Sequence, residues 1–316
     1  MSPLRSAPMA HVQLLPGEHV LSVLGRAHLY SSYRKMTDSL GEITDDLGVL
    51  SPGTIWRPAY NHVHQQWGEW LSLEEFAARH TLLNYYTPFT PSGSIPQINE
   101  EPRLAPPSAR VVRYTTQWRY CPECAERDVE SYGVPYFHFE HQLPCLTHCQ
   151  EHQSPLKSVC LGCGNDWQKL GKLLGPPLLA ECAQCGTPLG TVDSYWDEDV
   201  AWLQKVSLRL LKGEFAELNL AQLQSAYQQW LGLGPRSGVL NLKDRLIVKE
   251  AQIKLENHFD PRLFRLIFTN ADTSEQSKRT PTVSIYKAAF KDVALPPVVH
   301  LLLIRMMFGE LERIPK

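Results

Sequence analysis

The sequence predicts a mainly α-helical protein in which a small cysteine-rich module separates two helical parts. Apolar residues recur at helical spacing in the first and last thirds of the chain, which is the pattern of helices with one buried face. All eight cysteines lie between Cys121 and Cys185. We therefore expect three domains: an N-terminal helical domain at 1–112, the cysteine-rich module at 113–190 and a C-terminal helical domain at 191–316.

Two segments of the N-terminal part carry helix signals. The first follows Pro16-Gly17-Glu18, and its residues at helical spacing are Leu21, Leu24, His28 and Leu29. The second is expected to run from Ser72 to Leu83, with Ser72 as N-cap and acidic residues in the first turn, where the helix dipole favours carboxylates. The polar segment from Pro91 to Pro107 contains several prolines and is expected to be a linker.

The C-terminal part repeats this pattern. Asp197 and Asp199 precede an apolar stripe with a period near 3.6, formed by Val200, Leu203, Val206 and Leu210. Asn219 is expected to cap a second helix, which Gly232 and Pro235 would end. The polar segment 270–281 is expected to be an exposed loop.

Charge and composition indicate an ordinary folded protein. The hydrophobic fraction is 43%, and 31 Lys+Arg balance 33 Asp+Glu for a formal charge of −2. This balance neither establishes nor excludes a DNA partner, because a basic surface could be local. The longest apolar run, Val298 to Phe308, is interrupted by His300 and Arg305 and is too short to span a membrane. Since residues 1–16 also lack a secretory signal, we expect a cytoplasmic protein without a membrane partner.

The cysteines form regular pairs. Each pair, or Cys–His pair, has two residues between its members, namely Cys121 and Cys124, Cys149 and His152, Cys160 and Cys163, and Cys182 and Cys185. This spacing lets one tight turn direct two ligands to a metal ion, and two turns complete a tetrahedral zinc site. The gaps between paired units are 24 and 18 residues, and the second is typical of zinc ribbons.

The sequence therefore predicts two structural zinc ions. Pairing in chain order assigns Cys121, Cys124, Cys149 and His152 to one ion, and Cys160, Cys163, Cys182 and Cys185 to the other. Four protein ligands leave no open coordination position, which argues against a catalytic role. An interleaved pairing is the less economical alternative. Four regular half-sites within 65 residues of a cytosolic-looking chain argue against disulfides or free cysteines. Cys145 is expected to be a buried apolar residue, and His148 lies too close to Cys149 to chelate with it.

Catalytic signatures are weak. His138 and Glu140, followed by Pro144 and Cys145, partly match the signature of zinc deaminases, but the two halves are only three residues apart and the cysteine spacing is wrong. The chain contains no phosphate-binding loop, zinc-protease helix or dinucleotide-binding fingerprint. We therefore expect no catalytic residues, no cofactor other than zinc and no enzymatic activity.

An ordered series of motifs resembles a known family. Arg119-Tyr-Cys-Pro-Glu-Cys124 is followed by Tyr132-Gly-Val-Pro-Tyr136, His141-Gln-Leu-Pro144 and Cys149-Gln-Glu-His152. Together they resemble the TniQ/TnsD family of target-selection proteins from transposons with a heteromeric transposase. The segments Glu18–Arg26 and His80–Phe89 are similar to the family's N-terminal helix and to the aromatic stretch before its zinc region.

The resemblance implies a helix-turn-helix-like N-terminal domain and small zinc ribbon or finger modules. It also implies a non-catalytic adaptor in DNA transposition, which links a target to an AAA+ ATPase regulator and the transposase. Longer family members bind an attachment site on DNA directly, whereas shorter ones bind an RNA-guided Cascade complex and can form homodimers. The length and near-neutral charge of this chain favour the RNA-guided mode of a CRISPR-associated transposon. The alternative is a zinc-ribbon or helix-turn-helix transcription regulator that binds DNA with sequence specificity.

Overall fold

A computed structural model shows two compact units. The structure describes residues 12–46, 51–91, 98–100, 102–107, 111–160, 162–163, 175–178, 181–182, 184–191, 195–234, 240–269 and 283–315. Unit 1 comprises Met1–Leu82, Gln97–Ala105 and Thr116–Ser194, and unit 2 comprises Leu83–Pro96, Pro106–Thr115 and Tyr195–Lys316. The division into three consecutive domains stays a prediction.

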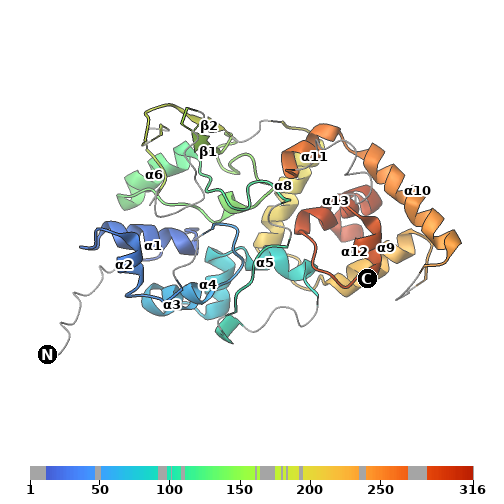
Figure 1. Ribbon diagram of the computed structural model, residues 1–316, viewed down its shortest axis with the longest axis horizontal. Helices are drawn as coiled ribbons and strands as arrows, with labels where there is room; N and C mark the ends of the chain where they lie inside the picture. The colour runs from blue at the N-terminus through green and yellow to red at the C-terminus, as the bar shows by residue number, and fades with distance from the viewer. Residues whose placement is uncertain are drawn as a thin grey trace. The chain divides into compact units, whose positions relative to one another are not determined.

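Unit 1 combines short helices with one small sheet (Figure 1). Its α-helices are α1 Val20–Leu29, α2 Met36–Leu40, α3 Pro58–Trp67, α4 Leu73–His80 and α6 Pro122–Tyr132. Its 3-10 helices are η2 Ile98–Glu100 and η3 Glu140–Gln142, and its strands are β1 Lys157–Cys160 and β2 Leu189–Thr191. The strands are antiparallel, with Lys157 opposite Thr191 and Cys160 opposite Leu189. The helix-turn-helix-like arrangement stays a prediction.

The regular elements of unit 2 among its described residues are all helices, and an isolated antiparallel bridge joins Val112 and Phe268. It contains α5 Leu83–Tyr86, η1 Thr87–Phe89, α8 Glu198–Leu211, α9 Leu220–Trp230, α10 Leu242–His258, α11 Pro261–Ile267, α12 Ile285–Phe290, α13 Pro297–Phe308 and η4 Leu311–Arg313. The predicted mainly α fold is confirmed.

The first predicted helix is confirmed as α1, and it begins beside a buried ion pair. Glu18 Oε1 accepts from Arg26 Nε at 2.8 Å, and Glu18 Oε2 accepts from Arg26 Nη2 at 2.6 Å. Both side chains are almost completely buried. Glu18 Oε2 also accepts from the Leu15 amide, and Arg26 donates to the Gln13 carbonyl. The pair therefore fixes the chain entering α1 against the helix itself.

The second predicted helix begins as expected but ends earlier. Ser72 caps α4 in a complete capping box with Glu75. The predicted end at Leu83 is wrong, because Thr81 has an extended backbone with φ −133° and ψ 171°. The Thr81 hydroxyl also donates to the Ala77 carbonyl at 2.7 Å, which satisfies a carbonyl near the helix end. A separate short helix, α5, then begins at Leu83.

The expected linker from Pro91 to Pro107 is wrong for part of its length. Leu104 forms an antiparallel bridge with Trp56, and its amide donates to the Trp56 carbonyl at 2.8 Å. The Ile98 carbonyl accepts from the Asn61 side chain at 2.8 Å. Polar composition did not reveal these backbone partners, which come from a segment some 40 residues earlier.

The C-terminal helix signals are confirmed. Asp197 caps α8 through Val200 N, and Asn219 caps α9 through Gln222 N. The predicted loop at 270–281 lies outside the described residues. The apolar run Val298–Phe308 forms most of α13, and within it His300 is fully buried and stacks on Phe89 at 5.2 Å between ring centroids. Within the described part of the chain, none of the helices combines the length and apolar character needed to cross a membrane.

Candidate metal centres

Two groups of four potential ligands form in unit 1. We call Cys121, Cys124, Cys149 and His152 cluster I, and Cys160, Cys163, Cys182 and Cys185 cluster II. In each cluster the four ligand atoms all lie within 4.8 Å of one another. These are the groups expected from pairing in chain order. The structure does not bring together the residues that an interleaved pairing would require. Metal ligation by these residues stays a prediction.

The distances in cluster I fit a tetrahedral zinc site. His152 Nδ1 lies 3.4 Å from Cys121 Sγ, 3.3 Å from Cys124 Sγ and 3.5 Å from Cys149 Sγ. The sulfurs of Cys124 and Cys149 are 3.6 Å apart. Zinc–ligand bonds of about 2.3 Å to sulfur and 2.0–2.1 Å to nitrogen require tetrahedral edges of about 3.8 Å and 3.5 Å. The sulfurs are too far apart for disulfides, whose bond length is about 2.05 Å.

Two different local structures present the ligands of cluster I. Cys121 is the N-cap residue of α6, and Cys124 lies in its first turn. Both positions lie at the positive end of the helix dipole, and the hydrogen bond with Cys124 lowers the pKa of Cys121. Cys149 and His152 lie on a tight turn, closed by the Cys149 amide donating to Ser154 O at 2.9 Å and the Gln153 amide donating to Cys149 O at 3.0 Å. Gln153 has a φ of +57°, which this turn requires.

A buried network joins the two halves of cluster I. Arg119 is fully buried and donates to the Leu146 carbonyl at 2.6 Å and the Leu143 carbonyl at 2.8 Å. The Gln142 side chain accepts from the Arg119 amide and donates to the Arg119 and His138 carbonyls. Arg119 and Gln142 therefore hold the segment before Cys121 against the segment that leads to Cys149.

A second connection runs from α6 to the N-terminal segment. Asp128 on α6 is fully buried and lies 2.8 Å from His138 Nε2. His138 forms an antiparallel bridge with Glu18, and the neighbouring His19 amide donates to the Phe137 carbonyl at 2.8 Å. The residues around α1 and those around cluster I are therefore parts of one packed structure.

Cluster II is built on the small sheet. Cys160 ends β1, and the Cys182 amide donates to the Thr187 carbonyl across a turn. Sulfur–sulfur distances are 3.4 Å for Cys160 and Cys185, and 3.6 Å from Cys163 to Cys160 and to Cys182. These values are again close to the edges of a zinc tetrahedron.

The glycines of cluster II have separate roles. Gly186 directly follows the second cysteine of its pair and has a φ of +70°, a backbone conformation that glycine adopts without a steric cost. The corresponding Gly164 lies outside the described residues. A Cβ on Gly162 would overlap the Thr187 side chain, so only glycine fits between the ligands at this position.

The two clusters differ in exposure. In cluster I the three cysteines are buried and His152 is half-buried, whereas in cluster II Cys163 and Cys185 are exposed. Hydrogen bonds from the other two thiols of cluster I lower the pKa of Cys149 to about 2, and hydrogen bonds from Thr187 lower the pKa of Cys185 to about 6. Hydrogen bonds with Cys121 and Cys149 raise the pKa of Cys124, so the thiolate, which is the form that binds metal, is favoured at Cys149 and Cys185.

The remaining candidates are placed outside the clusters. Cys145 is buried, as expected, and His148 is not among the grouped ligands. Sequence spacing alone did not assign roles to Arg119, Gln142 or Asp128, although the first two lie within the quoted motifs. Their roles depend on contacts across 10 to 27 residues, which no local periodicity indicates.

Fold and site together define a mainly α-helical protein whose unit 1 contains two Cys/His clusters that could each hold a metal ion. The model of the TniQ family matches residues 9–156, a range that includes α1 and all of cluster I. Residues 9–156 are therefore similar to a TniQ domain, as the motifs indicated, and a domain of this family implies a transposition-associated protein. No curated protein matches the chain.

Proposed function

We propose that this protein is a non-catalytic adaptor that selects target sites in DNA transposition. The observation that supports this function is the TniQ match over residues 9–156, in which the motif series forms one packed unit around cluster I. The adaptor links a target-recognition complex to an AAA+ ATPase regulator, which recruits the transposase. The target-recognition partner is an RNA-guided Cascade complex or the attachment-site DNA itself, and the adaptor can act as a homodimer.

The metal in both clusters is zinc, and its role is structural. The ligand sets of three thiolates with one imidazole and of four thiolates are those of structural zinc sites. Each set is complete, so an ion there would have no coordination position left for a substrate or an activated water. The clusters therefore stabilise unit 1, and Cys149→Ser or Cys182→Ser is expected to lower its thermal stability.

Near-neutral charge favours recognition of the target through a partner. A protein that contacts six to ten phosphates needs a marked basic surface. This chain has 31 Lys+Arg against 33 Asp+Glu. We expect the isolated protein to bind duplex DNA with a dissociation constant in the micromolar range or weaker at about 150 mM salt, as is usual for non-specific binding.

Pull-down with purified components tests the adaptor role. The full chain is immobilised and offered separately the ATPase and the Cascade complex encoded with it, with a zinc-depleted sample as the control. Retention of both components, lost in the depleted sample, is the expected result. Retention of neither component would refute the adaptor function.

A DNA-binding titration separates the two modes of target recognition. Fluorescence anisotropy at about 150 mM salt is measured with a duplex that contains the insertion site and with a scrambled duplex of equal length. Weak and equal binding is expected. Nanomolar binding that distinguishes the two duplexes would overturn partner-guided recognition and favour either direct attachment-site reading or a transcription regulator.

A further inference from the structure

Helix α10 of unit 2 has a buried face and an exposed apolar face. Val248, Ala251 and Leu255 are buried, and α10 contacts both α12 and α13. In Figure 1, α10 (orange) lies along one side of this unit, with α12 and α13 on its inner side. The opposite face of the helix is therefore the one that remains accessible.

Three aliphatic side chains form a stripe on that accessible face. Leu242 is 76% exposed, Leu246 is 52% exposed and Ile253 is 49% exposed. At about 100° per residue, these positions fall within about 40° of one another around the helix. They extend over about 16 Å, or three turns. Single exposed leucines are common on protein surfaces, but an aligned stripe of this length is typical of a face that binds another helix.

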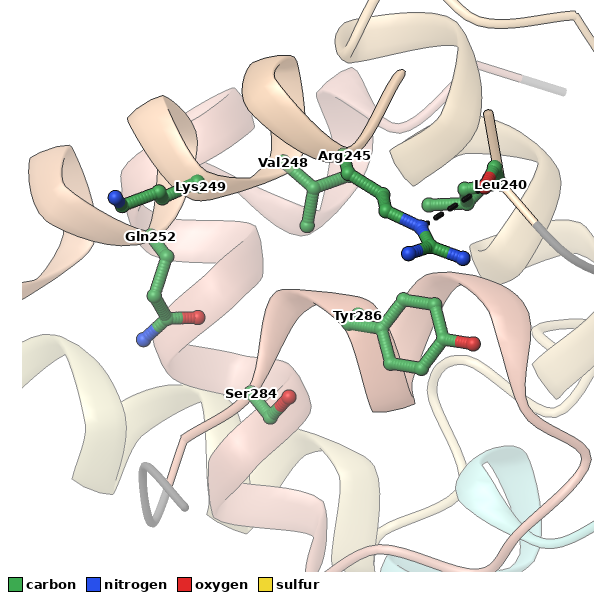
Figure 2. Close-up of a pocket in the computed structure, with 7 residues that line it drawn as sticks. All are labelled: Leu240, Arg245, Val248, Lys249, Gln252, Ser284 and Tyr286. Atoms are coloured by element: carbon green, nitrogen blue, oxygen red, sulfur yellow. Dashed lines mark hydrogen bonds between the residues drawn. The ribbon is translucent and has the colours of Figure 1, made fainter. Parts of the chain in front are cut away.

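A pocket of about 420 Å³ lies beside the stripe, between α10 and α12. Figure 2 shows Arg245 and Lys249 extending from α10 above Tyr286 and Ser284 of the following segment. The pocket is preformed, because Gln252 accepts from the Ile285 amide at 3.1 Å and donates to the Val283 carbonyl at 2.9 Å.

The two cations of the pocket have unused hydrogen-bond donors. Arg245 Nε donates to the Leu240 carbonyl at 2.9 Å, but its two terminal nitrogens and Lys249 Nζ have no partner among the described residues. None of the described residues that line the pocket is acidic. The two charged ends point toward opposite ends of the pocket in Figure 2, so a carboxylate at either end would find one positive charge with N–H donors.

We propose that the α10 stripe and the adjoining pocket bind an amphipathic helical segment of another protein, with aliphatic side chains on one face and a carboxylate beside them. The aliphatic residues would pack on Leu242, Leu246 and Ile253, and the carboxylate beside them would pair with Lys249, which lies on α10 between Leu246 and Ile253; Arg245, at the other end of the pocket, would accept a second acidic group. Nucleic acid is the less suitable occupant, because phosphates would leave the three aliphatic side chains without apolar partners. These residues lie outside the range matched by the TniQ family, so the site stands independently of the adaptor function.

Peptide selection on the full chain tests this proposal. The zinc-loaded protein is immobilised and offered a phage library of random 16-residue peptides, and the enriched peptides are synthesised and titrated by fluorescence anisotropy. We expect enriched peptides to carry Leu or Ile at spacings of three and four, together with Asp or Glu. Lys249→Glu and Leu246→Ser are each expected to weaken their binding by roughly tenfold or more, as for a central contact of an interface.

A matched charge reversal controls for the overall change in charge. Lys254 is an exposed lysine on a different side of the same helix, so Lys254→Glu should leave binding within about twofold. Circular dichroism checks that each variant keeps its helix content. Three results would overturn the proposal: no enriched class of peptide, equal binding by wild type and Lys249→Glu, or tighter binding of a 20-base-pair DNA duplex than of any selected peptide at this face.

Discussion

The buried pair of Glu18 and Arg26 is expected to stabilise unit 1 only as long as both partners are present. Glu18→Leu would leave the guanidinium of Arg26 buried without its carboxylate. Removing one partner of a buried ion pair costs about 3–5 kcal/mol, because the remaining charge stays desolvated. The Leu15 amide would also lose its acceptor.

The double variant Glu18→Leu/Arg26→Met separates this charge effect from simple loss of contacts. Replacing both charges with apolar side chains is often close to neutral. The double variant loses the bonds to the Leu15 amide and the Gln13 carbonyl, at about 1 kcal/mol each. We therefore expect it to be at least about 1 kcal/mol more stable than Glu18→Leu alone.

The free energy of unfolding of unit 1 is measured for the wild type and both variants by urea denaturation, with hydrogen exchange of the α1 amides as the probe. The exposed pair of Arg79 and Glu75 is the control, and Arg79→Ala should cost less than about 0.5 kcal/mol. A Glu18→Leu cost below about 1 kcal/mol would refute the reasoning. The reasoning would also be refuted if Arg26→Met destabilised the Glu18→Leu variant by as much as it destabilises the wild-type protein.

Three further outcomes are expected. Metal analysis should give two zinc ions per chain, and Cys145→Ser should leave this number unchanged. A chelator should remove the ion of cluster II before that of cluster I, because Cys163 and Cys185 are exposed; simultaneous release would contradict this reasoning. Gly162→Ala should lose the ion of cluster II alone, because its Cβ would displace Thr187, whereas Gly234→Ala, with open space around it, should lose neither. Burial lowers the pKa of His300 to about 3, so below about pH 6.5 the unfolded state binds a proton that the folded state does not. As the pH is lowered from about 6.5 toward 3, the stability of unit 2, measured by hydrogen exchange, should therefore fall by about 1.4 kcal/mol per pH unit. His300→Gln should remove this slope.

Sequence patterns were informative where structure depends on neighbours along the chain. The starts of α4, α8 and α9 followed from their capping side chains Ser72, Asp197 and Asn219, which act within three residues. The ligand groups of the two clusters followed from short spacings in the same way. The end of α4 was mispredicted because apolar periodicity continues past Thr81, although the backbone does not.

Long-range partners could not be inferred from these patterns. The hydrogen bonds of Gln142 to Arg119 span 23 residues, and the bridge between Trp56 and Leu104 spans 48. The ion pair of Glu18 and Arg26 illustrates the same limit, since glutamate and arginine side chains are usually exposed to solvent. Burial decided their role, and burial depends on the packing of the whole unit.

Because Cys121 and Cys124 lie at the start of α6, binding of the proposed zinc ion by both would couple metal uptake to helix nucleation. The first turn of a helix is its unfavourable step, since several dihedral angles are fixed for a single hydrogen bond. An ion bound by both cysteines would fix that turn from outside and so lower the nucleation barrier. Asp128 lies further along the same helix and forms a hydrogen bond with His138. The backbone of His138 forms an antiparallel bridge with Glu18, just before α1. The moment at which cluster I acquires its metal would therefore set when the N-terminal helix can dock during folding of the nascent chain.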